Sequence, residues 1–149
     1  MPLSITAIDN CRFLYLAGIS EPEDNVLRLL ISEVKAQEMR AEAESGPASR
    51  IEPIVSDETC RAFEVIWPSY VAYSVRNESY CVADPYERFT GTRFVLYERS
   101  RYLDFISVAA VDLSDIVGTY RHWGIFCLNH IVDVVSTQDP AITIISKTR

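Results

Sequence analysis

Both histidines of the 149-residue chain lie in one stretch, residues 120–133, together with a cysteine. Cys127 and His130 are the residue types of a nucleophilic thiol and its general base. Asn129 or Asp133 could orient the imidazole, as the third member of a nucleophilic triad does. The composition of this stretch therefore suggests a catalytic site.

The spacing of these residues supports catalysis only in a helix. Three residues apart on a helix, Cys127 and His130 share a face, and the thiol and imidazole could meet. On a strand they point to opposite sides, and His122, the alternative base, lies about 26 Å from His130. Residues 122–128 and 131–136 are rich in β-branched and aromatic side chains, which favour strands. We therefore favour a buried Cys127 that acts as a small hydrophobe, with His130 bonded to a backbone carbonyl.

Metal and cofactor chemistry has little support in the sequence. His122, Cys127 and His130 have a ligand-like spacing, but a strand would scatter them and a fourth ligand is not evident nearby. The chain lacks the glycine-rich phosphate-binding signatures and has only 5 glycines. The sequence therefore predicts neither a metal nor a cofactor.

A second candidate site lies in residues 70–80, which read as a strand. Tyr70, Arg76 and Glu78 share one face of it and combine an aromatic ring, a guanidinium and a carboxylate. Such a surface could bind an anion or a protein partner. The plainer alternative is an internal Arg76–Glu78 pair with tyrosines at the sheet rim. We predict a binding surface that joins this strand to the segment around Arg121–His130, formed by Tyr70, Tyr73, Arg76, Glu78, Arg121 and Trp123.

Negative charge is concentrated near the N-terminus. The chain has a formal net charge of −7, and its first 60 residues hold 11 acids and 5 bases. A capping signature at Ser20 and an apolar stripe predict a helix to about Glu42. Its acidic face is either simply solvated or attracts a basic partner near Glu38, Glu42 and Glu44.

The remaining patterns predict mainly strands. Residues 4–8 and 12–19 read as an opening hairpin, and Ser100 can cap a helix that begins after it. Further strands are expected at 63–67, 71–75, 92–98 and 141–146. The predicted fold is a single α+β domain over residues 1–149, a mostly antiparallel sheet packed against two helices. A β-sandwich with helical insertions is the alternative.

Three functions fit these observations. The first is a cytosolic protein-binding module, such as an acidic inhibitor or immunity-like partner of a basic protein. The second is a small hydrolase or transferase that uses Cys127 with His130 or His122. The third is a small-ligand carrier with an aromatic pocket formed by Trp67, Tyr73, Trp123 and Phe126.

We favour the binding module, a non-enzymatic role. The acidic balance argues against nucleic acid as a partner. The sequence lacks both a signal peptide and an apolar run long enough for a membrane span, and so predicts no membrane association. A homodimer through an exposed sheet edge is possible.

Overall fold

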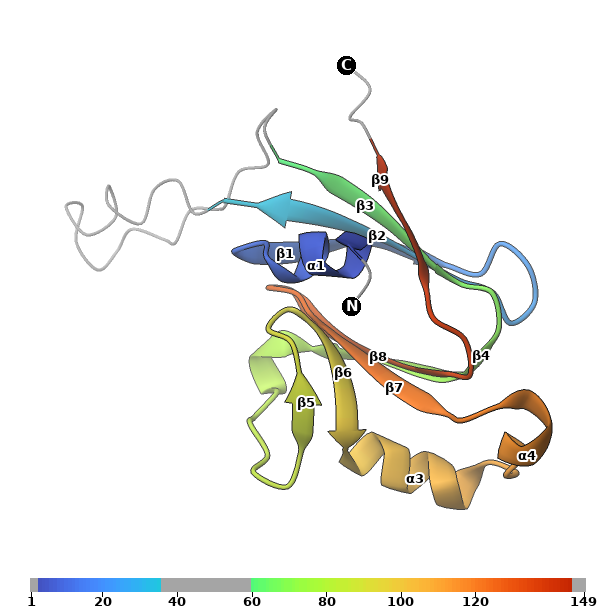
Figure 1. Ribbon diagram of the computed structural model, residues 1–149. Helices are drawn as coiled ribbons and strands as arrows, with labels where there is room; N and C mark the ends of the chain where they lie inside the picture. Colours follow the sequence, from blue (N-terminus) through green and yellow to red (C-terminus); the bar gives the residue numbers. More distant parts are fainter. Residues whose placement is uncertain (1–2, 36–59, 146–149) are drawn as a thin grey trace.

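Two antiparallel sheets dominate the computed structural model, which describes residues 3–35 and 60–145 (Figure 1). The first sheet has the order β1-β2-β3-β9, and the second has the order β4-β8-β7-β6-β5. This arrangement confirms a mostly antiparallel α+β fold. The strands of the first sheet are β1 (Phe13–Ser20), β2 (Leu27–Val34), β3 (Ala62–Trp67) and β9 (Ala141–Ile145); those of the second are β4 (Tyr70–Asn77), β5 (Arg88–Thr90), β6 (Phe94–Arg99), β7 (Arg121–Phe126) and β8 (His130–Ser136).

The helices within residues 3–35 and 60–145 are few and short. Helix α1 (Leu3–Asp9) lies between the two sheets, whereas α3 (Arg101–Ala109) and α4 (Ser114–Val117) lie beyond the second sheet (Figure 1). A single 3-10 turn, η1 (Glu78–Tyr80), follows β4. Among the described helices, none is long and apolar enough to cross a membrane.

A shared corner joins the two sheets. Strand β3 leads into β4, and β8 leads into β9, so that the β3–β9 and β4–β8 pairs follow one another along the same chain segments. The Ser136 hydroxyl donates to the Ser69 carbonyl at 2.6 Å and ties this corner together. A short ladder irregularity between Tyr70 and Ala72 accompanies the bend.

The outer edge of β1 is covered by the β7–β8 turn. The Asn129 side chain accepts from the Leu16 amide and donates to the Leu16 carbonyl, both at 3.0 Å. The Leu128 amide donates to the Leu14 carbonyl at 2.8 Å. These bonds satisfy part of a strand edge that would otherwise be open to pairing with another chain.

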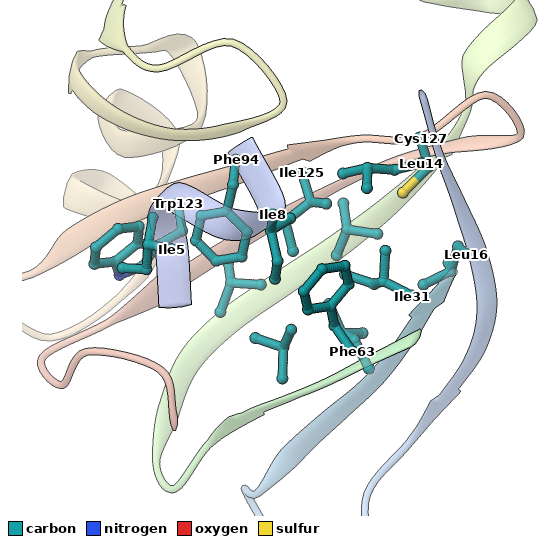
Figure 2. Close-up of a cluster of buried hydrophobic side chains, with 14 of the residues drawn as sticks. Ile5, Ile8, Leu14, Leu16, Ile31, Phe63, Phe94, Trp123, Ile125 and Cys127 are labelled. Atoms are coloured by element: carbon teal, nitrogen blue, oxygen red, sulfur yellow. The ribbon is translucent and has the colours of Figure 1, made fainter. Parts of the chain in front are cut away.

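The hydrophobic core fills the space between the sheets. Phe63, Val65 and Trp67 alternate with less buried residues along β3, as the period-two pattern predicts. Trp67 stacks on Phe94 of the opposite sheet with ring centroids 6.1 Å apart. Figure 2 shows Ile5 of α1 reaching the same cluster, which also includes Ile8, Leu14, Ile31, Phe94, Trp123 and Ile125.

Two sequence predictions near the N-terminus were wrong. Residues 4–8 lie in α1, because Ile5 and Ile8 are spaced to bury one face of a helical turn. The segment expected to be helical from Ser20 contains β2, which pairs with both β1 and β3. Its apolar residues fit both the helical and the strand period. The segment forms a strand because it pairs with a neighbouring strand on each side. The acids Glu38, Glu42 and Glu44 lie outside the described residues.

Candidate functional site

Cys127 and His130 form the turn of the β7–β8 hairpin, not the face of a helix. The Cys127 amide donates to the His130 carbonyl at 2.9 Å and closes this turn. The Cys127 side chain is only 3% exposed, and burial raises the pKa of its thiol to about 12. The geometry therefore favours a protonated, structural Cys127, since the thiolate is the nucleophilic form.

The two histidines occupy different ends of this hairpin. His122 lies opposite Val135, five residues along β8 from His130, which corresponds to about 16 Å at the usual rise per residue. The helical arrangement on which catalysis by Cys127 depended is absent. In residues 3–35 and 60–145, no group of three or more His, Cys, Asp or Glu side chains is placed to hold a metal ion, and the four cysteines are free thiols.

His122 instead belongs to a buried chain of hydrogen bonds. Its Nδ1 lies 2.7 Å from the Ser100 Oγ, and its Nε2 lies 2.7 Å from Asp133 Oδ1. The other carboxylate oxygen of Asp133 accepts from an Arg76 Nη2 at 3.2 Å. We call Ser100, His122, Asp133 and Arg76 the polar chain.

The hydrogen-bond partners around the polar chain fit the tautomer of His122 that carries its proton on Nε2. The Ser100 Oγ accepts from the Leu103 amide at 3.0 Å, so its own hydrogen is free to donate to His122 Nδ1. A neutral imidazole then carries its proton on Nε2 and donates it to Asp133. The carboxylate also accepts from the Arg76 guanidinium, and in this way each group in the chain has a partner.

Strand pairing and one helix cap bring these residues together. Ser74 and Gly124 lie opposite Asp133 in the neighbouring strands, so Arg76 and His122 are its diagonal neighbours on the outer face of the second sheet. Ser100 is the N-cap of α3, as predicted. Its second role, as the partner of His122, could not be read from the spacing, because it depends on how α3 folds back over the sheet.

Aromatic rings cover the imidazole on this outer face. The Tyr97 ring stacks on the His122 ring with centroids 4.0 Å apart and an interplanar angle of 7°, and Tyr102 of α3 lies 5.3 Å away. A Cβ added at Gly124 would be 2.7 Å from the Tyr97 ring. Glycine at this position therefore lets the ring lie against the sheet beside His122.

The polar chain contains the residue types of a serine hydrolase site, but its serine is not accessible to a substrate. Ser100 is 0% exposed and His122 is 1% exposed, so a substrate carbonyl has no route to the hydroxyl. The same hydroxyl oxygen also caps α3. What reaches the surface is the other end of the chain, the Arg76 guanidinium, which the buried groups hold in place.

The exposed end of the polar chain borders a cavity of about 340 Å³, which we call the polar cleft. It lies between the second sheet, α3 and the segment that precedes β5. Its charged and aromatic lining includes Arg76, Asp133, Glu87, Arg101, Tyr102 and Phe105.

Of the other predicted binding residues, the structure brings only Tyr70 and Tyr73 together, with ring centroids 4.9 Å apart. Tyr70 and Tyr73 donate to Glu21 in the β1–β2 loop, and the Glu21 contact raises the pKa of Tyr70 to about 12. Glu78 begins η1, and Arg76 pairs with Asp133 instead of Glu78. Arg121 pairs with Asp139, and Trp123 faces the core.

The predicted aromatic pocket is also divided. Trp67 and Trp123 pack in the core, and both belong to the same buried cluster. Phe126 instead borders a cavity of about 260 Å³ beside Cys127, Leu128 and Ile131. Tyr73 packs against the core from the second sheet.

A surface that the sequence did not indicate lies on α3 and α4. Only Ile106 of α3 is buried, although the apolar spacing predicted a buried stripe. We call the following exposed apolar side chains the α3–α4 patch: Val108, Val111, Leu113, Ile116 and Val117.

The chain matches no family model, and no match to it was found among curated proteins or solved structures.

Proposed function

We propose that the protein is a binding module that docks a basic protein partner through the α3–α4 patch. The observation that carries the proposal is the exposure of large apolar side chains on one short segment, with Val108 at 88% and Ile116 at 81%. A cluster of exposed apolar side chains with polar neighbours is typical of interaction sites, because water solvates such a surface poorly.

Charge around the patch defines the chemistry of the partner. From Tyr102 to Tyr120 the sequence contains Asp104, Asp112 and Asp115 and no Lys or Arg. All three carboxylates are exposed. An apolar surface with lysine or arginine at its rim would complement this segment and be attracted at long range.

The same charges disfavour two other occupants. A second copy of the chain, related by a two-fold axis, would bring like charges together across a shared interface. A membrane with anionic lipids would repel the carboxylates around the patch. A basic protein surface is therefore the occupant with the best electrostatic fit.

The proposal can be tested with a defined probe, a synthetic amphipathic helix of leucine and lysine. We expect it to bind the full chain, to bind more weakly as salt screens the carboxylates, and to lose at least about tenfold in affinity to a Val108→Ser/Ile116→Ser variant. Fluorescence anisotropy of the labelled peptide measures all three effects.

Matched controls separate docking from general stickiness. Ile144→Ser removes an exposed apolar side chain from β9 of the first sheet, whereas the patch lies beyond the second sheet (Figure 1). This variant should leave the affinity unchanged. A leucine and glutamate helix should not bind. Equal loss of affinity in both variants, tighter binding to anionic vesicles than to the peptide, or self-association that the patch variant abolishes would each overturn the proposal.

A further inference from the structure

The buried part of the polar chain holds one partly exposed group, the Arg76 guanidinium, in place. Burying Asp133 and His122 costs solvation free energy, which is recovered only if every polar atom finds a partner. The chain ends at Arg76, whose side chain is 49% exposed and lines the polar cleft. Asp133 is the one hydrogen-bond partner of this guanidinium among the described residues, so its remaining N–H donors are free for a ligand.

The polar cleft offers a second, opposite charge. Of its three carboxylates, Asp133 pairs with Arg76 and Asp84 pairs with Arg101 at 3.0 Å. Glu87 accepts only a backbone N–H of Arg101, at 3.2 Å, and has no ion pair within the described residues. The cleft thus presents a held guanidinium and an uncompensated carboxylate.

The uncharged part of the lining combines Ser74 with three large side chains. Tyr102 and Phe105 of α3 and Val82 form part of the wall, and Phe105 and Val82 are largely exposed. A ligand with an aromatic or aliphatic group would cover these side chains and remove apolar area from water. A volume of about 340 Å³ is at the small end of ligand pockets.

From these features we infer that the polar cleft binds a small zwitterion, an amino acid with an apolar side chain. Arg76 binds the carboxylate through its planar fork, and Glu87 binds the ammonium group. Tyr102 and Phe105 contact the side chain. The buried Ser100, His122 and Asp133 act as positioning residues, because they fix the guanidinium before the ligand arrives.

Three probes of similar size separate the contributions of the ammonium and carboxylate groups to binding. L-Phenylalanine carries both charges, 3-phenylpropionate lacks the ammonium group, and 2-phenylethylamine lacks the carboxylate. We expect phenylalanine to bind at least about tenfold more tightly than either analogue, as charge-assisted hydrogen bonds would provide. Calorimetry gives the affinities, and NMR shifts of the Tyr102 and Phe105 amides locate the ligand.

Variants of Glu87 and Arg76 then test which charged group of the ligand each residue binds. Glu87→Gln keeps an oxygen for the Arg101 amide and should weaken phenylalanine binding several-fold without changing phenylpropionate binding. Arg76→Gln should weaken both, and Arg76→Lys should weaken phenylalanine less than Arg76→Gln does. The control Arg28→Gln makes the same change on the first sheet and should have no effect.

The inference would be overturned by equal affinity for the three probes, by an absence of binding at millimolar phenylalanine, or by NMR shifts away from the cleft. Glu87→Gln provides the decisive result if Arg76→Gln fails to fold. The Val108→Ser/Ile116→Ser variant should bind phenylalanine normally, so this test is independent of protein docking.

Discussion

The two sheets use the same alternation of side chains in different ways. The first sheet packs one face against the core and exposes ion pairs such as Arg28–Glu64 on the other. Around His122 the second sheet is covered on both faces: Trp123 and Ile125 face the core, while His122 and Asp133 are buried on the outer face, where Tyr97 and Tyr102 of α3 contact the His122 ring. Covering the second face turns an ordinary polar strand surface into a buried, connected network.

This difference has an energetic consequence. A half-exposed ion pair contributes little, because water solvates the separated charges almost as well. A buried polar network contributes strongly only when complete, since removing one member leaves its partners without hydrogen bonds and without water. The two sheets should therefore respond very differently to the loss of one polar side chain.

The largest contrast is expected between His122→Ala and Arg28→Ala. His122→Ala leaves Asp133 Oδ1 without its imidazole partner, leaves the Ser100 hydroxyl with only its bond from the Leu103 amide, and opens a void beside Tyr97. We expect it to lower the free energy of unfolding by about 3–5 kcal/mol, against about 1 kcal/mol or less for Arg28→Ala. Urea denaturation measures both. Similar losses in the two variants would show that the polar chain is no more cooperative than a surface pair.

A smaller contrast is expected between two glycines, one in each sheet. A Cβ at Gly124 would lie 2.7 Å from the Tyr97 ring, whereas at Gly18 on β1 the nearest atom is 3.5 Å away. Gly124→Ala should therefore cost about 1–3 kcal/mol through overpacking. Gly18→Ala is the matched control and should cost less, or even stabilise the strand. Thermal unfolding of both variants checks the difference, and a neutral Gly124→Ala would mean that Tyr97 can leave His122 at little cost.

The same contrast explains which features the sequence could predict. Strands β3, β4, β7 and β8 were predicted because their alternation is local, and Ser100 was predicted as a helix cap for the same reason. Strand β2 was not, because its apolar residues fit two periods and its neighbours in the sheet decide between them. The sequence patterns also did not predict contacts between residues that are distant in the sequence.

The candidate site depends almost wholly on such distant contacts. His122 and Asp133 were noted by residue type, but His122 was considered only as an alternative base for Cys127, and Ser100 only as a helix cap. Ser100 and His122 are 22 positions apart in the sequence, and the segment between them includes the whole of α3 and α4. Local patterns give no information on where such a segment folds back, whereas a hairpin partner such as Asp133 can be anticipated once the turn is known.

The smallest expected effect concerns acid stability and the Arg61–Glu33 pair on the first sheet. Burial acts to raise the pKa of Glu33, but hydrogen bonds from the Arg61 side chain and amide outweigh it and lower the pKa from 4.5. An acid with a lowered pKa stabilises the fold above its unfolded pKa and loses this contribution as the pH falls through the folded pKa.

Arg61→Gln should therefore reduce stability by about 0.5–1 kcal/mol at neutral pH, because the pair is partly exposed. Below about pH 4 the difference from the parent chain should shrink, since protonated Glu33 no longer attracts the guanidinium. Arg61 also contacts the Cys11 sulfur and lies over the Phe63 ring, and these contacts persist in acid. Urea denaturation across pH 3–7 separates the two parts: a difference that stays constant with pH would assign the role of Arg61 to packing, and one that grows in acid would contradict the lowered pKa of Glu33.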